Sequence, residues 1–192
     1  MPNTFTKSVA MLLRLFKRGI NHYPQLSIIV IITLVYFITG RLGMLMHFAS
    51  NDITLIWLPT GIAIAALLRC GYRVWPAITL GAVMVEIAIG APLGLALATS
   101  VGSTLGPLLS AFLLNKLKFN HAILTFNDIS SLIIATFVGM LVTSGLGVLS
   151  MLEFDALIVQ TSINTIISSN TYSAWFFYWL GDTVGVFLAL PL

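Results

Sequence analysis

Long apolar runs, separated only by short polar breaks, occupy almost the whole of this sequence. Hydrophobic residues make up 58% of its 192 residues, and charged residues only 8%. Soluble domains carry about 25% charged residues, so water cannot solvate such a chain on all sides. Lipid must surround most of it, and backbone amides in lipid need internal partners. Because the apolar runs are continuous rather than alternating, the sequence predicts an all-α integral membrane fold.

The polar breaks divide the chain into spans. A spanning helix needs about 20 apolar residues, which leaves room for roughly six or seven spans joined by short loops. Residues 156–169 are short and polar for a span, so we expect an outer interfacial or re-entrant helix there. If this stretch does span, the number of spans becomes seven and the C-terminus changes sides. The expected polytopic bundle of about six transmembrane helices covers residues 25–48, 53–70, 74–91, 93–114, 129–150 and 171–192.

The first 24 residues differ from the rest, and we expect two domains: a segment at 1–24 and a transmembrane domain at 25–192. Wound as a helix, residues 1–24 place Lys7, Arg14 and Arg18 on one side and apolar side chains on the other. This pattern is typical of an N-terminal interfacial amphipathic helix held on the membrane surface by anionic lipid.

The basic residues outside this segment indicate topology. Arg69 and Arg73 form one basic break, and Lys116 and Lys118 form another, whereas the break at 153–155 is acidic. This alternation predicts a cytoplasmic N-terminus by the positive-inside rule. The net charge of +3 is therefore no sign of a nucleic-acid partner.

Small residues recur at every fourth position in three of the predicted helices. Close approach through small residues is the main source of helix association in lipid, so these stripes predict packing seams. The stripes are Gly94, Ala98, Gly102, Gly106 and Ser110; Ala135, Gly139, Thr143 and Gly147; and Gly181, Gly185 and Ala189.

Three ionisable residues lie inside predicted spans: Arg41, Glu86 and Asp182. At about 1.5 Å per residue their depths are similar, so Arg41 could pair with either carboxylate. Each costs several kcal/mol unless it is paired or wetted. One interpretation is a ligand pocket open to the periplasmic side, and the other is a polar cluster that only fixes helix register. Arg41 alone could instead extend to the outer headgroups.

Aromatic residues and a proline extend the candidate pocket. Trp57, Trp175, Tyr178 and Trp179 fall in the outer half of their spans, where aromatic residues also form the interfacial belt. Pro59, inside the predicted span 53–70, would kink the helix or free the Leu55 carbonyl as a ligand contact. The candidate ligand-binding residues are Arg41, Trp57, Pro59, Glu86, Trp179 and Asp182.

The sequence predicts neither catalysis nor a cofactor. His22, His47 and His121 are scattered without metal-ligand spacing, and Cys70 is the single cysteine. No nucleophile elbow, zinc-protease motif or phosphate loop is present. We expect any enzymatic output to lie outside this chain.

Two stretches together resemble a known family. Residues 57–63 (WLPTGIA) are followed by 71–76 (GYRVWP), and residues 178–186 (YWLGDTVGV) by Leu190-Pro191-Leu192. In order and spacing they resemble the bacterial membrane-associated sensor domain of type one, over about residues 30–192. The stretch 102–106 (GSTLG) matches that family's Gly-Asn-Thr-Leu only in part. The signature positions are Trp57, Pro59, Gly61, Trp75, Pro76, Trp179, Gly181, Asp182, Gly185 and Pro191.

The resemblance implies the sensory input of a diguanylate cyclase, a cyclic-diguanylate phosphodiesterase or a histidine kinase in the bacterial inner membrane. The family domain usually continues with about two more helices, so this chain corresponds to about two-thirds of it. The implied partners are the lipid bilayer, a small-molecule or membrane signal, a cytoplasmic effector and a second copy of the chain. The alternative is a small transporter or the substrate-binding subunit of a transporter, although no internal repeat supports it.

Overall fold

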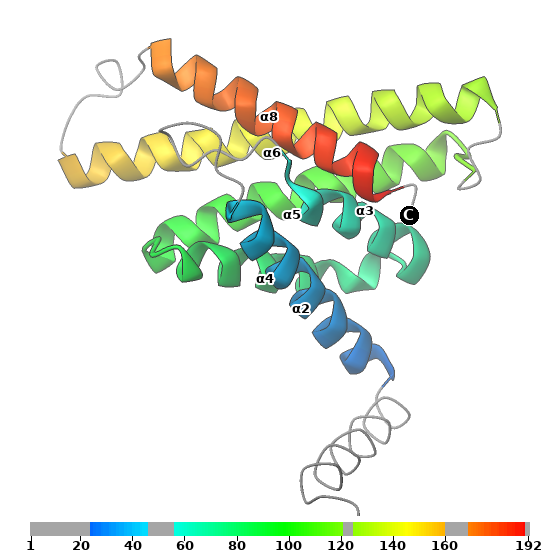
Figure 1. The fold of residues 1–192 in the computed structure, drawn as a ribbon, viewed down its shortest axis with the longest axis horizontal. Helices are drawn as coiled ribbons and strands as arrows, with labels where there is room; N and C mark the ends of the chain where they lie inside the picture. The colour runs from blue at the N-terminus through cyan, green and yellow to red at the C-terminus, as the bar shows by residue number, and fades with distance from the viewer. Residues whose placement is uncertain (1–23, 46–55, 121–124, 160–168, 191–192) are drawn as a thin grey trace, which may run out of the picture.

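The computed structural model describes residues 24–45, 56–120, 125–159 and 169–190. Within these ranges every regular element is helical, which confirms the predicted all-α class (Figure 1). The expected amphipathic segment lies outside the described residues, apart from Pro24. The helices are α2 (Pro24–Met44), α3 (Leu58–Cys70), the 3₁₀ helix η1 (Tyr72–Val74), α4 (Trp75–Ala88), α5 (Leu93–Lys116), α6 (Phe126–Val159) and α8 (Ser169–Ala189).

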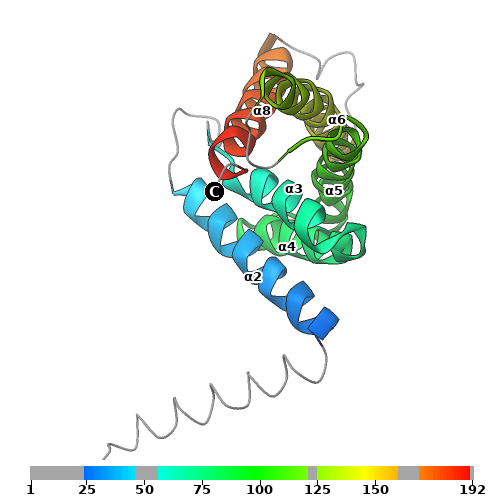
Figure 2. The same cartoon turned by 90° about the vertical axis from the view of Figure 1, so that its right-hand side faces the viewer.

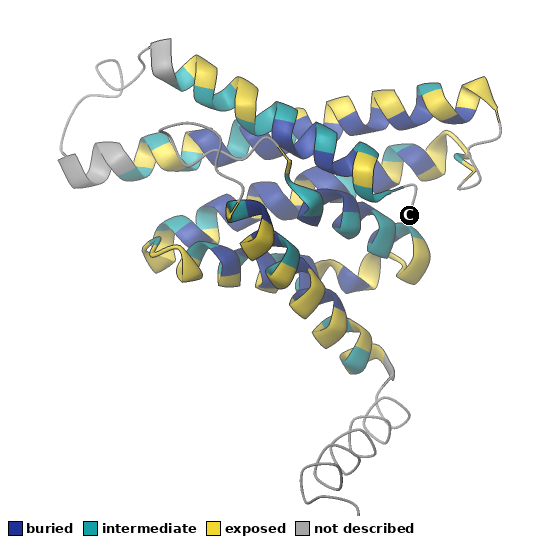
Figure 3. Ribbon diagram, viewed as in Figure 1, coloured by how far each residue is buried: buried dark blue, intermediate teal, exposed yellow. Residues whose placement is uncertain are grey.

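Three of these helices are long and apolar enough to cross a membrane. They contain the segments Gln25–Met44, Leu93–Lys116 and Phe126–Phe154. Leu58–Cys70 is apolar but shorter. Many large apolar side chains lie exposed along the outside of the bundle. Figure 3 shows that exposed positions run along α2. A surface of this kind requires lipid as its solvent, so the chain is an integral membrane protein.

The helices surround α3. It packs against α2, α5 and α8, while α4 joins α2 to α5 and α6 joins α5 to α8. Figure 2 shows α8, α6, α5, α4 and α2 following one another around it. The shortest of the α-helices, α3, therefore lies at the centre of the bundle.

The second predicted span begins later than expected. Helix α3 starts at Leu58 instead of residue 53, and Pro59 falls in its first turn. A proline there costs no hydrogen bond, because the first amides of a helix have no intrahelical partner. The predicted mid-helix kink at Pro59 is therefore wrong, and Leu55 lies outside the described residues.

The fifth predicted span is longer than expected. Helix α6 continues to Val159, so residues 153–155 are helical and do not form the predicted acidic loop. Neither glycine nor proline interrupts residues 148–159, and the Glu153 side chain is exposed instead of buried in the bundle. Of the expected interfacial stretch, 156–159 ends α6 and 160–168 lies outside the described residues.

The stripes of small residues in α5 and α6 pack against each other, so their predicted role as packing seams is confirmed. A Cβ on Gly106 would lie 2.7 Å from the Gly139 carbonyl oxygen, and a Cβ on Gly139 would lie 2.7 Å from the Gly106 carbonyl oxygen. The hydroxyl of Ser110 donates to the Ala135 carbonyl at 3.0 Å. Only small residues allow the two antiparallel backbones to approach this closely.

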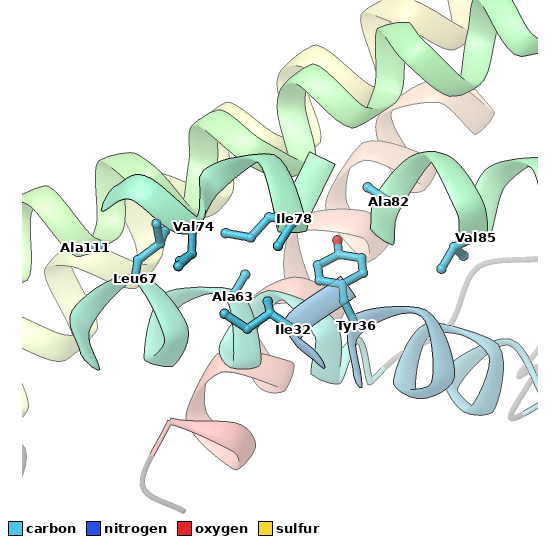
Figure 4. Close-up of a cluster of buried hydrophobic side chains, with 10 residues drawn as sticks. Ile32, Tyr36, Ala63, Leu67, Val74, Ile78, Ala82, Val85 and Ala111 are labelled. Atoms are coloured by element: carbon cyan, nitrogen blue, oxygen red, sulfur yellow. The ribbon is translucent and has the colours of Figure 1, made fainter. Parts of the chain in front are cut away.

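A second contact joins α2 to α4, which run in the same direction. Thr33 donates to the Ala77 carbonyl at 3.1 Å, and a Cβ on Gly81 would lie 2.9 Å from the Tyr36 side chain. Figure 4 shows Tyr36 within a cluster of buried apolar side chains from α2, α3, η1, α4 and α5. Its hydroxyl is the polar group of that labelled cluster.

Glycine-to-alanine substitutions in α6 test the seam. We expect Gly139→Ala to lower the free energy of unfolding by about 1–3 kcal/mol, because its new methyl group meets the α5 backbone. Gly145 has nothing within 4 Å of its added Cβ. Gly145→Ala is the matched control and should leave Tm unchanged or slightly higher. Thermal unfolding of the purified protein in detergent measures both, and equal Tm values would contradict the seam.

Candidate functional site

Two distant segments of the chain meet where α3 begins. The amide of Trp57 donates to the Gly181 carbonyl at 3.0 Å, so the backbone entering α3 is tied to α8. One turn further, the Thr60 hydroxyl donates to Oδ1 of Asp182 at 2.6 Å. These are the two stretches that resemble the sensor family, and the structure places them in direct contact.

Glycines allow this contact. A Cβ on Gly61 would lie 2.6 Å from the Gly185 carbonyl oxygen and 2.9 Å from the Val186 Cα. A Cβ on Gly185 would overlap the Trp57 carbonyl group. Because both neighbours are backbone atoms, a larger residue at either position would push α3 and α8 apart. Gly185 thus confirms the third predicted stripe.

Asp182 is enclosed by the bundle and only half satisfied. Its exposed fraction is 1%, its Oδ1 accepts the Thr60 hydrogen bond, and its Oδ2 has no hydrogen-bond partner. The buried hydroxyls of Thr136 and Thr183 also lack partners. Buried polar groups are nearly always hydrogen-bonded, and a carboxyl group away from water is among the costliest to leave alone.

Two tyrosines share the surroundings of Asp182. The buried Tyr36 hydroxyl is in hydrogen-bonding contact with the Ser103 and Trp57 side chains, and Tyr178 also contacts Ser103. Both tyrosines lie close enough to Asp182 to interact electrostatically with its carboxylate. We call Tyr36, Thr60, Ser103, Tyr178 and Asp182 the buried polar cluster. Its members come from α2, α3, α5 and α8.

The other predicted ionisable residues do not join this cluster directly. Glu86 is partly buried, is in hydrogen-bonding contact with Thr99, and acts on both tyrosines electrostatically. Arg41 is exposed, and its guanidinium donates to the Ala88 carbonyl at 3.2 Å. The pairing of Arg41 with Glu86 or Asp182 that similar depths allowed does not form. The free carbonyls at the end of α4 attract the cation, and exposure spares it the cost of burial.

The candidate tryptophans separate into two groups. Trp57 lies half-buried beside Tyr36, next to the buried Pro59. Trp179 instead faces α6, where its Nε1 donates to the Phe137 carbonyl at 3.4 Å and its ring lies edge-on to Phe137 at 5.1 Å. The structure therefore brings Trp57, Pro59 and Asp182 together, leaves Glu86 at the margin, and places Arg41 and Trp179 elsewhere. Ligand binding by these residues stays a prediction.

Sequence reasoning missed three members of the cluster, Tyr36, Thr60 and Ser103. Thr60 lies within the family-like stretch 57–63 but was not singled out there. A signal for Tyr36 was present, because Thr33, Tyr36 and Gly40 recur at helical spacing within an apolar span and share one face. Ser103 lies in the stretch 102–106, which matched the family only in part. A serine in a membrane helix most often bonds its own backbone, so its type alone does not indicate a site.

A lipid-embedded helical bundle with polar groups in its interior defines a class, the polytopic membrane domain with an internal polar site. The model of the membrane-associated sensor family MASE1 matches residues 28–192, and the chain belongs to this family. No curated protein and no solved structure matched the chain. MASE1 is a membrane sensor domain typical of signalling proteins.

Replacing the threonine of the α3–α8 contact tests its energetic role. Thr60→Val keeps the shape but leaves both oxygens of Asp182 without a donor, so we expect a loss of about 1–3 kcal/mol in unfolding free energy. Thr39 bonds only carbonyls of its own helix. Thr39→Val is therefore the matched control, with an expected loss below about 0.5 kcal/mol.

A double substitution refines this test. In an Asp182→Leu background, Thr60→Val should cost much less, because the carboxylate that it leaves unpaired is absent. Thermal unfolding in detergent of the two single variants and the double variant measures the coupling. Additive losses would show that the two side chains act independently.

Proposed function

We propose that this chain is the sensory input domain of a bacterial signalling protein and that its signal acts at the buried polar cluster. Membership of the sensor family supports the general role. The half-satisfied Asp182 supports the location, since a bundle that needed only stability would be served as well by apolar residues there. The output expected downstream is a diguanylate cyclase, a cyclic-diguanylate phosphodiesterase or a histidine kinase.

The α3–α8 contact supplies a route from the cluster to the output. The two helices run in the same direction, and two hydrogen bonds and one pair of glycines join the start of α3 to α8 near the cluster. A signal that binds one arrangement of this contact more tightly than another shifts the population between them. A shift of α8 would carry the change along that helix toward the basic end of the bundle.

We also propose that all six helices cross the bacterial inner membrane, with the basic end in the cytoplasm. The side-chain amide of Asn115 donates to the Tyr72 hydroxyl at 2.8 Å. This hydrogen bond holds the break after α3 beside the end of α5. The basic residues of these two breaks, at 69, 73, 116 and 118, therefore share one end, as the positive-inside rule requires. Helices as short as α3 and α4 can cross where the bilayer thins.

Cysteine labelling tests this orientation. In a Cys70→Ser background, Glu153→Cys should react with a membrane-impermeant maleimide in intact spheroplasts. Lys118→Cys should react only after the membrane is opened. The reverse order would place the basic end outside the cell and overturn the proposed topology.

Substitution of Asp182 tests the sensory role. We expect Asp182→Asn, in a fusion of residues 1–192 to a diguanylate cyclase reporter, to change cyclic-diguanylate output at least about threefold. This corresponds to a shift of roughly 0.7 kcal/mol between two states. Glu153→Gln makes the same change of charge on an exposed face of α6 and is the control. Unchanged output from normally inserted Asp182→Asn would reduce this residue to a structural role.

A further inference from the structure

We infer that the buried polar cluster binds one small monovalent cation, an alkali or simple ammonium ion, through Oδ2 of Asp182 and hydroxyl groups of the cluster. This inference rests on the proposed function, because it names the chemical class of signal that would act at the cluster. The observation behind it is a carboxylate that is 1% exposed, with one oxygen bonded to Thr60 and the other without a partner.

Within the described ranges, the protein supplies no counter-charge to Asp182. The basic residues there are Arg41, Arg69, Arg73, Lys116 and Lys118, and all of them are exposed. Arg41, which the sequence suggested as a partner, instead donates a hydrogen bond to the Ala88 carbonyl. A buried carboxylate without a cation is costly, so a positive charge must come from outside the chain or the group must take up a proton.

The donor atoms favour an ion bound through oxygen. Tyr36 and Tyr178 are each in hydrogen-bonding contact with Ser103 and interact electrostatically with Asp182, and neither sulfur nor imidazole is part of the cluster. Hard cations bind such oxygen atoms. A single fully buried carboxylate balances a single positive charge. Among the described residues no group of three or more His, Cys, Asp or Glu could hold a metal ion, which argues against a divalent ion.

Glu86 and the aromatic rings add to the preference for a cation. Glu86 acts electrostatically on the same two tyrosines, so the field in this part of the bundle is negative from two sides. Trp57 and both tyrosines place aromatic rings at the edge of the cluster, and such rings attract cations.

A cation at Oδ2 would act on the α3–α8 contact directly. Asp182 is held by α3 through Thr60, and the cation would attach the same carboxylate to hydroxyls of α2 and α5. The occupied cluster would therefore join four helices through one carboxylate. Without the ion, the unbalanced negative charge of Asp182 would favour looser packing of these four helices around the cluster.

Cation-dependent thermal unfolding of the purified 192-residue chain in detergent tests this inference. Sodium, potassium and methylammonium chlorides each replace N-methylglucamine chloride at constant ionic strength. One or more should raise Tm by roughly 3 °C for each tenfold increase in concentration above its dissociation constant. The three salts distinguish an alkali ion from an organic ammonium ion, since the ion that binds raises Tm at the lowest concentration.

Three variants assign the shift to the cluster. Asp182→Asn should abolish the cation-dependent rise in Tm. Tyr36→Phe keeps the buried ring and should move the rise to roughly tenfold higher cation concentration, which corresponds to a loss of about 1.4 kcal/mol in binding free energy. Glu153→Gln should leave it unchanged. If Asp182→Asn does not fold, an unchanged shift in Tyr36→Phe overturns the inference.

Two further outcomes contradict the inference. A Tm that does not depend on any of the three cations but falls or rises with pH would mean that a proton alone neutralises Asp182. A shift that persists in Asp182→Asn would place the ion elsewhere. Because unfolding requires no output domain, either result leaves the sensory role standing. A normal shift without any change of reporter output would instead overturn the proposed function and keep the cation site.

Discussion

Because lipid chains solvate apolar side chains as well as other side chains do, helices in a membrane gain little by burying them against one another. Helices α3 and α8 are held instead by backbone contact at Gly61 and Gly185 and by the hydrogen bonds beside it. This contact fixes where Asp182 lies. Without the two glycines, the Thr60 hydroxyl could not reach the carboxylate, and the polar groups of four helices would not share one interior site.

Much of the architecture could be predicted from the sequence. Spacing of small residues predicted which faces of α5 and α6 form packing seams, although not that these two helices pair, and the helices begin and end near the predicted breaks. The errors have local causes. Pro59 suited a first turn better than a helix interior, so α3 starts later than its apolar run does. Glu153 remains in α6 because neither glycine nor proline interrupts the helix there and its side chain is not buried in the bundle.

The candidate site was predictable only in part. Asp182 and Trp57 were found because a charge in a span and a family signature each mark a position without reference to neighbours. Their partners depend on helix rotation, which a single sequence does not fix. Tyr36 and Ser103 belong to the cluster only because α2 and α5 turn those faces inward. Arg41 failed as a partner because depth alone says nothing about which side of a helix a residue occupies.

The two seams of the bundle differ in a way that bears on signalling. The α5–α6 seam extends from Gly94, which packs against Phe154, to Ser110, so many small contacts would have to change together for it to move. The α3–α8 contact is concentrated at a few residues, and one of them carries an oxygen without a partner. A change at that oxygen acts on the carboxylate that Thr60 binds, and so on one of the few interactions that join α3 to α8. It does not touch the small-residue contacts that join α5 to α6. A signal that acts at this oxygen, as we propose, would therefore bias the α3–α8 contact while leaving the α5–α6 pair in place.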